Sequence, residues 1–450
     1  MAKSPAKRIA VIGAGWAGCA AAVELADQGH QVILLEASRT LGGRARKVEL
    51  QGKPVDNGQH ILLGAYSASL RLMRKVGVDT DKALLRLPLQ ICYPAGSDGM
   101  QFVAPRLPAP LHLLWALIRA TGLSHEDKMS LARFSTTARW MGWQMHQDCS
   151  VSELLQRFDQ TDRLSRLMWT PLCIAALNTP PERASAQVFL NVLRDSLGAK
   201  RAASDMLIPR TDLSALFPEH ASQFVQARGG QVLCGRTVKK IRRDAHADWS
   251  LDYGNGGTEQ RTAGFDAVII ATGAETAAGL LAGLEAELNG AEHTTALPRF
   301  DYEPITTCYL QYDAGLQLPR PFFALRDDPE NGNWGQFVFD RGQLDAGQAG
   351  LLAVVVSASN DAIELGNEAL ATAVATQLAQ TLGMPALAVP IWQQVISEKR
   401  ATFSCTPGLV RPQNLTSAPG LLIAGDYTIG EYPATLEAAV RSGIQAAQLI

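Results

Sequence analysis

The strongest constraint on the fold is a glycine-rich turn close to the start of the chain. Residues 8–12 (RIAVI) are apolar and run directly into Gly13, Gly15 and Gly18, which have the spacing GxGxxG. Residues 19–28 are rich in alanine and predict a helix. A strand, a turn of this kind and a helix open a doubly wound parallel sheet, so the sequence predicts an α/β protein.

The residues of this turn have separate geometric tasks. Gly13 allows the tight turn, Gly15 lets the backbone approach a pyrophosphate, and Gly18 lets the helix pack closely on the strand. Trp16 and Ala17 complete the loop before the helix, whose N-terminal N–H groups attract phosphate. The turn therefore predicts a phosphate-binding site.

A carboxylate stands where the ribose of a dinucleotide would lie. Residues 31–35 predict a second strand, and Glu36 follows at its end, 18 residues after Gly18. A carboxylate at this place accepts hydrogen bonds from both ribose hydroxyls. Together with the turn, Glu36 predicts a dinucleotide cofactor.

Further segments favour FAD over NAD. Gly43 brings the chain close to the pyrophosphate and Arg44 can neutralise it bidentately, the alternative for Arg44 being a solvated surface position. Near the other end, residues 420–424 predict a buried strand that runs into Gly425 and Asp426.

The last helix points to the flavin end of the cofactor. Pro433 suits a helix start, and residues 434–449 have helical composition. Its N-terminus, with Ala434 and Thr435, would stabilise the negative charge of a reduced flavin. These segments together predict FAD.

The motifs at both ends of the chain resemble those of the flavin-containing amine oxidase and phytoene desaturase superfamily. Residues 55–66, 398–403 and 432–443 are similar to a narrower group, the squalene-associated FAD-dependent desaturase-like proteins of bacterial hopanoid pathways. The resemblance implies reductive dehydroxylation of hydroxysqualene to squalene. It also implies a hydrophobic isoprenoid substrate and an electron donor that the sequence does not identify.

The resemblance assigns roles beside the flavin ring. Gly58, Gln59 and His60 belong to the segment that passes the ring in this superfamily. His60 could donate a proton to a departing hydroxyl, or it could simply be hydrogen-bonded to the backbone. Asp56 is expected to cap the turn before Gly58.

Two more roles follow from the resemblance. Lys399 is expected to take the place of the lysine that holds a water at flavin N5 in related oxidases, unless Arg400 fills that place or both face solvent. Val238 lies in the segment whose backbone pairs with adenine in the superfamily.

Three other functions remain open. The first is a carotenoid or phytoene-type desaturase that oxidises a C–C bond, and the second is an amine oxidase. Amine oxidases of this fold usually place aromatic residues against the flavin, whereas Tyr432 is followed here by Pro433, Ala434 and Thr435, the isoprenoid-type pattern. The third is a non-catalytic flavin-binding partner of a squalene-forming complex.

The order of the expected elements indicates two interleaved domains. A Rossmann-type FAD-binding domain is predicted from residues 1–82, 206–298 and 391–450. An α+β substrate-binding domain is predicted from residues 83–205, which look helical, and residues 299–390, which alternate strands and turns.

Composition bounds the partners and the compartment. Hydrophobic residues at 47%, charged residues at 19% and a formal net charge of −2 describe a globular enzyme and give no sign of nucleic-acid binding. The seven cysteines are scattered without a metal-binding pattern, so we expect no metal and a reducing, cytoplasmic compartment. Residues 1–8 contain no apolar signal core.

Two segments bear on membrane contact. Residues 369–397 carry no charge, but their glutamines, glycine and prolines predict a helix, a turn and a strand rather than a bilayer span. Residues 107–118 are apolar, carry Trp115 and lie between Arg106 and Arg119. They suit a helix that lies in the membrane interface, at the inner face of the cell membrane, or that lines a lipid entrance. The alternative is a core helix of the second domain.

Overall fold

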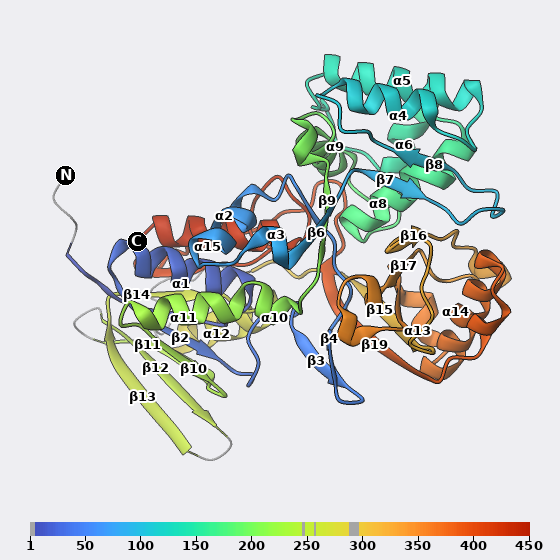
Figure 1. Ribbon diagram of the computed structural model, residues 1–450. Coiled ribbons are helices and arrows are strands. Elements are labelled where there is room, and N and C mark those ends of the chain that lie inside the picture. The colour runs from blue at the N-terminus through green and yellow to red at the C-terminus, as the bar shows by residue number, and fades with distance from the viewer. Residues whose placement is uncertain (1–4, 245–247, 256–257, 288–296) are drawn as a thin grey trace.

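The computed structural model describes residues 5–244, 248–255, 258–287 and 297–450. Residues 1–4, at the start of the segment without a signal core, therefore lie outside the described residues. Figure 1 shows a layered region at the N- and C-termini, a second sheet with its own helices, and a helical region above that sheet.

The central sheet has five parallel strands in the order β10-β2-β1-β14-β20. Its strands are β1 (Arg8–Ile12), β2 (Gln31–Glu36), β10 (Gln231–Cys234), β14 (Ala267–Ile270) and β20 (Leu421–Ile423). Three distant parts of the chain thus form one sheet. Their carboxyl ends share one edge, which is where α/β sheets bind ligands.

Alternate side chains of the central strands enter two different cores. Ile9 and Val11 pack on one face, while Ala10 and Ile12 pack on the other. The first face is covered by α1 (Trp16–Gln28), α2 (Ser67–Lys75), α11 (Pro218–Ala227) and α15 (Leu436–Gln448). The second is covered by β11 (Thr237–Arg243), β12 (Trp249–Asn255), β13 (Thr258–Phe265) and α12 (Ala274–Glu287).

The second sheet is antiparallel, in the order β16-β17-β18-β15-β19. Its elements are β15 (Tyr302–Gln311), β16 (Phe322–Ala324), β17 (Phe337–Asp340), β18 (Leu351–Ser357) and β19 (Trp392–Phe403), with α13 (Asn360–Glu364) and α14 (Asn367–Leu382). The helix α14 packs against one face. The hairpin β3 (Lys47–Leu50) and β4 (Lys53–Asp56) reaches toward this sheet from the first region (Figure 1).

The helical region contains α4 (Leu111–Arg119), α5 (His125–Trp140), α6 (Val151–Arg157), α8 (Thr170–Leu177) and α9 (Ala186–Ser196). Residues 83–205 also form strands that the sequence did not predict: β6 (Leu84–Leu87), β7 (Gln90–Cys92) and β8 (Gln101–Val103). These strands have only three or four residues each, so their two-residue alternation is too short to stand out.

Several local predictions are confirmed or corrected. The uncharged run at 369–397 forms all of α14 except its first two residues, the short helix η6 (Pro385–Ala388) and the start of β19, which agrees with the predicted helix, turn and strand. The helix α1 begins at Trp16, three residues earlier than expected. The helix α15 begins at Leu436, two residues later, because the Thr435 side chain caps it by accepting a hydrogen bond from the Ala438 N–H.

The described residues also bear on membranes and metals. None of their helices combines the length and apolar character that crossing a bilayer requires. Within the described ranges, no group of three or more His, Cys, Asp or Glu side chains is placed to hold a metal ion.

Candidate active site

A cavity of about 630 Å³ lies at the carboxyl edge of the central sheet and extends to the second sheet and α8. Fifteen of the residues singled out in the sequence line it: Gly13, Gly15, Trp16, Ala17, Glu36, Gly43, Arg44, Gly58, Gln59, His60, Val238, Gly425, Asp426, Ala434 and Thr435. Segments from both ends and the middle of the chain therefore meet around one space. Gly18 and Lys399 are not among its lining residues.

The glycine turn shows two kinds of close approach. A methyl group on Gly18 would lie 1.9 Å from the Gly13 carbonyl oxygen, so Gly18 is required for packing of helix on strand, as predicted. Gly15 differs, because its backbone is extended and an added methyl group would meet only the Gly43 Cα, at 3.9 Å. Nothing in the protein itself requires a glycine at position 15, so the open space beside it fits a ligand that approaches the backbone.

The first turn of α1 faces the same space. Gly15 is the N-cap residue of α1 and no side chain caps the helix. Its free N–H groups and partial positive charge suit a pyrophosphate. The lining residues of the turn therefore fit the phosphate end of FAD.

Glu36 is buried at the end of β2 and is held by the backbone. Its Oε2 accepts a hydrogen bond from the Ala14 N–H at 2.7 Å, and its Oε1 accepts one from the Ser38 N–H at 2.8 Å. Each carboxylate oxygen has a second lone pair, so the fixed carboxylate can still accept from ribose hydroxyls.

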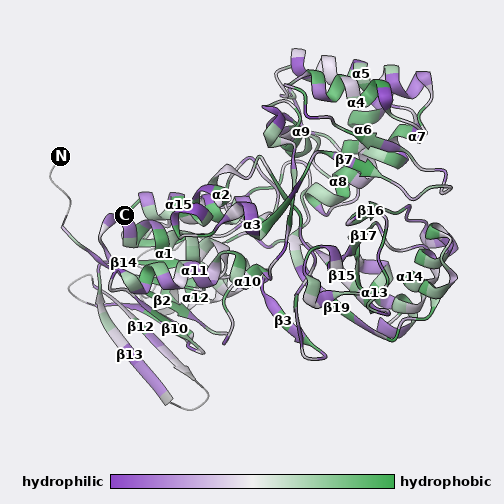
Figure 2. Ribbon diagram, in the orientation of Figure 1, coloured by the Kyte–Doolittle hydropathy of each residue, from purple (hydrophilic) through white to green (hydrophobic). Residues whose placement is uncertain are grey.

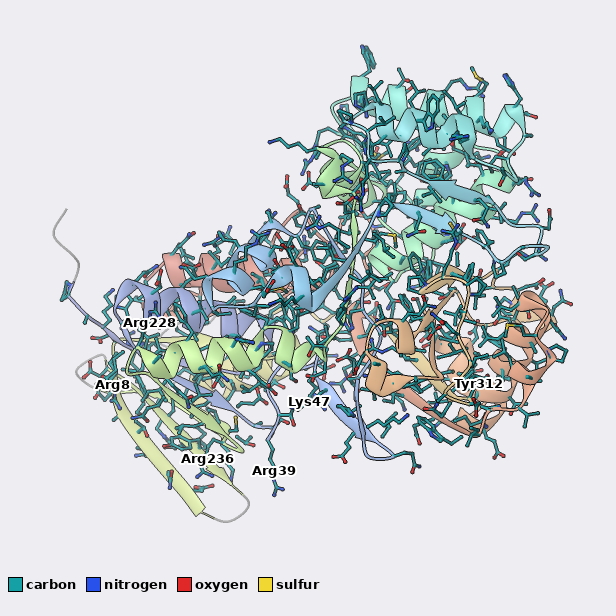
Figure 3. The ribbon with its side chains drawn as sticks, in the orientation of Figure 1. Arg8, Arg39, Lys47, Arg228, Arg236 and Tyr312 are labelled. Atoms are coloured by element: carbon teal, nitrogen blue, oxygen red, sulfur yellow. The ribbon has the colours of Figure 1, made fainter. Side chains whose placement is uncertain are left out.

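A basic residue that the sequence reading missed lies beside Glu36. Arg236, labelled in Figure 3, lines the cavity two residues before Val238, and its backbone N–H donates to the Glu36 carbonyl at 2.8 Å. Val238 is buried in β11, next to a register shift in its pairing with β12. The pair of Arg236 and Val238 places a cation and an apolar wall at the nucleoside end.

Arg44 lines the cavity, but its guanidinium is already bound within the protein. Its Nη2 donates to both oxygens of Asp426 at 2.7 Å, and its Nη1 donates to the Ala401 carbonyl at 2.6 Å. Asp426 raises the pKa of Arg44 above its usual value. The contact with Asp426 joins the two predicted cofactor segments, and the predicted contact of Arg44 with the pyrophosphate stays a prediction.

The loop after β4 brings His60 to the cavity. The His60 Nδ1 lies 2.7 Å from the Gly58 carbonyl oxygen, so Nδ1 carries the proton that is donated in this bond. Burial lowers the pKa of His60. The neutral ring then presents a bare Nε2, which accepts rather than donates. This geometry matches the backbone-bonded alternative for His60 and disfavours its role as an acid.

A buried arginine holds this loop from behind. The Arg341 Nη1 donates to the Gln59 Oε1 at 2.9 Å, and the Gln59 Nε2 donates to the His60 carbonyl at 3.2 Å. Arg341 is only 1% exposed, and its Nη2 has no hydrogen-bond partner within the described part of the chain. Arg341 belongs to no motif that could be recognised in the sequence.

Asp56 has a different role from the one expected. It does not cap its own turn; its Oδ1 accepts from the Leu213 N–H at 2.7 Å, at the start of α10 (Leu213–Leu216). Burial raises the pKa of Asp56 to about 7, although the nearby Arg341 acts in the opposite direction. Asp56 is absent from the cavity lining.

The structure does not bring Lys399 to the cavity. Lys399 is exposed on β19, whereas Glu398 and Arg400 on either side of it line the space. The pairing of β19 with β15 is irregular here, because its register shifts between Glu303 and Ile305, opposite the segment that contains Lys399. The alternative residue, Arg400, lines the cavity and pairs with Glu275.

The far end of the cavity is largely apolar and aromatic. Its walls there include Ile174, Ile305, Phe337, Phe339, Val355 and Phe403. Tyr427 also lines the cavity, and its buried hydroxyl has no hydrogen-bond partner within the described residues. The sequence reading missed Tyr427, although it directly follows the predicted Gly425 and Asp426.

Comparison with known proteins places this site in a family. The chain is 30% identical to the hydroxysqualene dehydroxylase of Rhodopseudomonas palustris, covering 99% of this chain and 98% of the relative. It is 25% identical to the zeta-carotene desaturase of Synechocystis, covering 98% and 97%. The fold is similar to that of a putative protoporphyrinogen oxidase from Exiguobacterium, with a TM-score of 0.68, 18% identity and 99% coverage of both chains.

The family model for flavin containing amine oxidoreductase matches residues 16–450. This match confirms the predicted superfamily, the FAD cofactor and the interleaved α/β fold class, and it makes the protein an FAD-dependent oxidoreductase. The chain belongs to the flavin containing amine oxidoreductase family.

Proposed function

We propose that this protein converts hydroxysqualene to squalene by reductive dehydroxylation. The observation that carries the proposal is the full-length similarity to the hydroxysqualene dehydroxylase of Rhodopseudomonas palustris at 30% identity. That value exceeds the 25% identity to the zeta-carotene desaturase of Synechocystis.

The reaction balances as a two-electron reduction. One C–O bond of the substrate breaks and one C–H bond forms, so the carbon receives a hydride and the leaving oxygen receives a proton to become water. When bound, reduced FAD supplies the hydride, and an electron donor of still undefined class restores its reduced form.

The apolar end of the cavity suits such a substrate. Hydroxysqualene is a long hydrocarbon with one allylic hydroxyl, so most of its binding energy comes from burial of apolar surface. Phe337 and Phe339 from β17 and Ile174 from α8 supply apolar walls. The ring faces also tolerate positive charge on the carbon that loses the hydroxyl.

Two polar side chains of the cavity act on the hydroxyl in this proposal. Tyr427 presents a phenolic O–H with no partner in the described part of the chain, so it can donate a hydrogen bond to the leaving oxygen. Neutral His60 can orient the substrate hydroxyl by accepting its hydrogen bond at Nε2. The proton that completes water then comes from solvent.

The proposed place of action is the cytoplasmic side of the cell membrane. All seven cysteines are free thiols, as expected in a reducing compartment. The proposed substrate dissolves in lipid, so the protein must collect it at a membrane surface.

The test is turnover by the purified holoenzyme alone. Anaerobic protein reduced with dithionite is mixed with hydroxysqualene, and products are followed by gas chromatography while flavin reoxidation is followed by absorbance. We expect squalene to form in step with oxidised flavin. Oxidised protein and dithionite without protein serve as controls.

A variant pair tests the cavity itself. Phe337→Ala removes part of the apolar wall and should raise KM roughly tenfold, whereas Val389→Ala, at an exposed site outside the lining, should leave KM unchanged. Desaturation of phytoene by the oxidised protein, with no action on hydroxysqualene, would move the assignment to the carotenoid desaturases. Oxidation of amines would move it to the amine oxidases.

A further inference from the structure

The helix α4 is turned with its apolar side toward solvent. Leu111, Leu114, Trp115 and Ile118 recur at helical spacing, and each is between 46 and 58% exposed. A helix on the surface of a soluble protein normally presents polar residues at these positions. We name this stripe of four residues the α4 face.

The opposite side of α4 is the buried one. Ala116 is 1% exposed and His112 is fully buried, with its Nε2 3.5 Å from the Ser204 hydroxyl. Leu113 and Leu117 pack partly against the core of the helical region. The helix is therefore anchored by a histidine, an alanine and two half-buried leucines, while the four bulky residues of the α4 face remain outside.

The charged residues within α4 and in the segments directly before and after it are basic. Residues 101–124 contain Arg106 and Arg119 and neither Asp nor Glu. Both arginines are exposed, and the Arg119 guanidinium lies 5.7 Å from the centre of the Trp115 ring. The Lys128 ammonium of α5 adds a third cation at the end of the helix, since it donates to the Ile118 carbonyl at 2.9 Å, although the exposed Glu126 stands two residues before it.

We propose that the α4 face docks on a membrane surface that contains anionic lipids. Leucine, isoleucine and tryptophan side chains insert at the boundary between headgroups and acyl chains, and basic residues beside them pair with lipid phosphates. Figure 2 shows that α4 is mostly hydrophobic while α5 mixes both classes, so the apolar contact is concentrated on one helix. This inference rests on exposure and charge, and it stands independently of the proposed substrate.

The helical region that carries α4 also contributes to the cavity. In Figure 1 the helix α8 lies below α4, on the side of the second sheet. Ile174, Ala175 and Ala176 of α8 line the cavity. Docking through α4 would thus hold the region that supplies part of the apolar cavity wall at the membrane from which an isoprenoid substrate comes.

The test is sedimentation of the holoenzyme with vesicles. One set contains equal parts of phosphatidylglycerol and phosphatidylcholine, and the other contains phosphatidylcholine alone. We expect binding to the anionic vesicles that weakens as salt is raised. Leu114→Gln combined with Trp115→Gln should lower the partition coefficient by at least roughly tenfold.

Matched variants separate the α4 face from general effects. Val389→Gln combined with Ile391→Gln removes two exposed apolar side chains elsewhere and should leave vesicle binding unchanged. Arg106→Gln combined with Arg119→Gln should weaken binding to anionic vesicles more than to neutral ones. Flavin content and melting temperature of every variant should match the wild type, because all of these side chains are exposed.

Three outcomes would overturn the proposal. The first is wild-type protein that stays in the supernatant with both kinds of vesicle. The second is the Leu114 and Trp115 variant binding as well as the wild type. The third is a wild-type dimer that this variant converts to monomer without any vesicle binding, since the face would then be covered by a second copy of the chain. None of these outcomes depends on turnover of hydroxysqualene.

Discussion

Gly15→Ala should weaken FAD binding without weakening the fold. The added methyl group would meet only the Gly43 Cα at 3.9 Å, and the Gly15 backbone is in a region open to any residue. The methyl group would instead occupy space at which a pyrophosphate approaches. Overpacking of a close contact costs about 1–3 kcal/mol, which is about 5–150-fold in the dissociation constant of FAD.

Two other glycines serve as matched references for this substitution. Gly18→Ala would put a methyl group 1.9 Å from the Gly13 carbonyl oxygen, so it should destabilise the apoprotein itself. Gly279 lies in α12, and a methyl group added there would have nothing within 4 Å. Gly279→Ala should therefore leave FAD affinity unchanged, and it should leave the stability of the apoprotein unchanged or raise it slightly.

Melting of apoprotein and FAD titration together separate these effects. FAD at about 100 times its dissociation constant stabilises the native state by about 2.7 kcal/mol. A variant with a 100-fold weaker site keeps only about 0.4 kcal/mol of this gain. We expect that loss for Gly15→Ala, with an unchanged melting temperature of the apoprotein. Wild-type FAD affinity, or apoprotein destabilisation equal to that of Gly18→Ala, would refute the reasoning.

Three further predictions follow from the polar contacts. Arg44→Ala and Asp426→Ala should each lower FAD affinity, and the double variant should lose less than the sum by about 0.5–3 kcal/mol, as measured by FAD titration. Asp56 has a folded pKa of about 7, above its unfolded value of 3.8, so its contribution to stability is present below about pH 4 and is lost as pH rises to about 7. Asp56→Asn should therefore be more stable than wild type at pH 8, by up to about 4 kcal/mol, and should gain nothing at pH 4, as measured by denaturant unfolding. His60→Ala should slow turnover by less than about tenfold, because its proton is bound to the Gly58 carbonyl; a loss of 10²–10⁴-fold would restore the acid role.

The parts of the site that could be predicted are those fixed by short stretches of backbone. The turn from β1 to α1 depends on Gly13, with φ +100°, and on the contact of Gly18 with the Gly13 carbonyl five residues earlier. Glu36 follows because the next parallel strand must end at the same edge. Residue type and spacing determine local geometry of this kind, so it can be predicted from the sequence.

Contacts between distant segments could not be predicted in the same way. Arg44 meets Asp426 across 382 residues, and Arg341 meets Gln59 across 282 residues. Both contacts depend on how β19, β20 and the second sheet pack on the FAD-binding region. No spacing of residues along the sequence indicates this packing. The sequence therefore predicted neither the contact of Arg44 with Asp426 nor the contact of Arg341 with Gln59.

The sequence also did not predict which side chains of β19 face the cavity, nor which side of α4 faces the core. Lys399 does not line the cavity, whereas Glu398 and Arg400 on either side of it do. The register of β19 against β15 shifts at this place, so a simple two-residue alternation does not predict which side chains line the cavity. The only polar residues of α4 are His112 and Arg119, so hydrophobic periodicity alone cannot decide which side faces the core. Packing decides it, because the small Ala116 lets the helix approach its neighbours closely while Trp115 does not fit there. The bulky side chains of α4 that remain exposed are not needed for packing within the helical region, so the α4 face is free to contact a lipid surface.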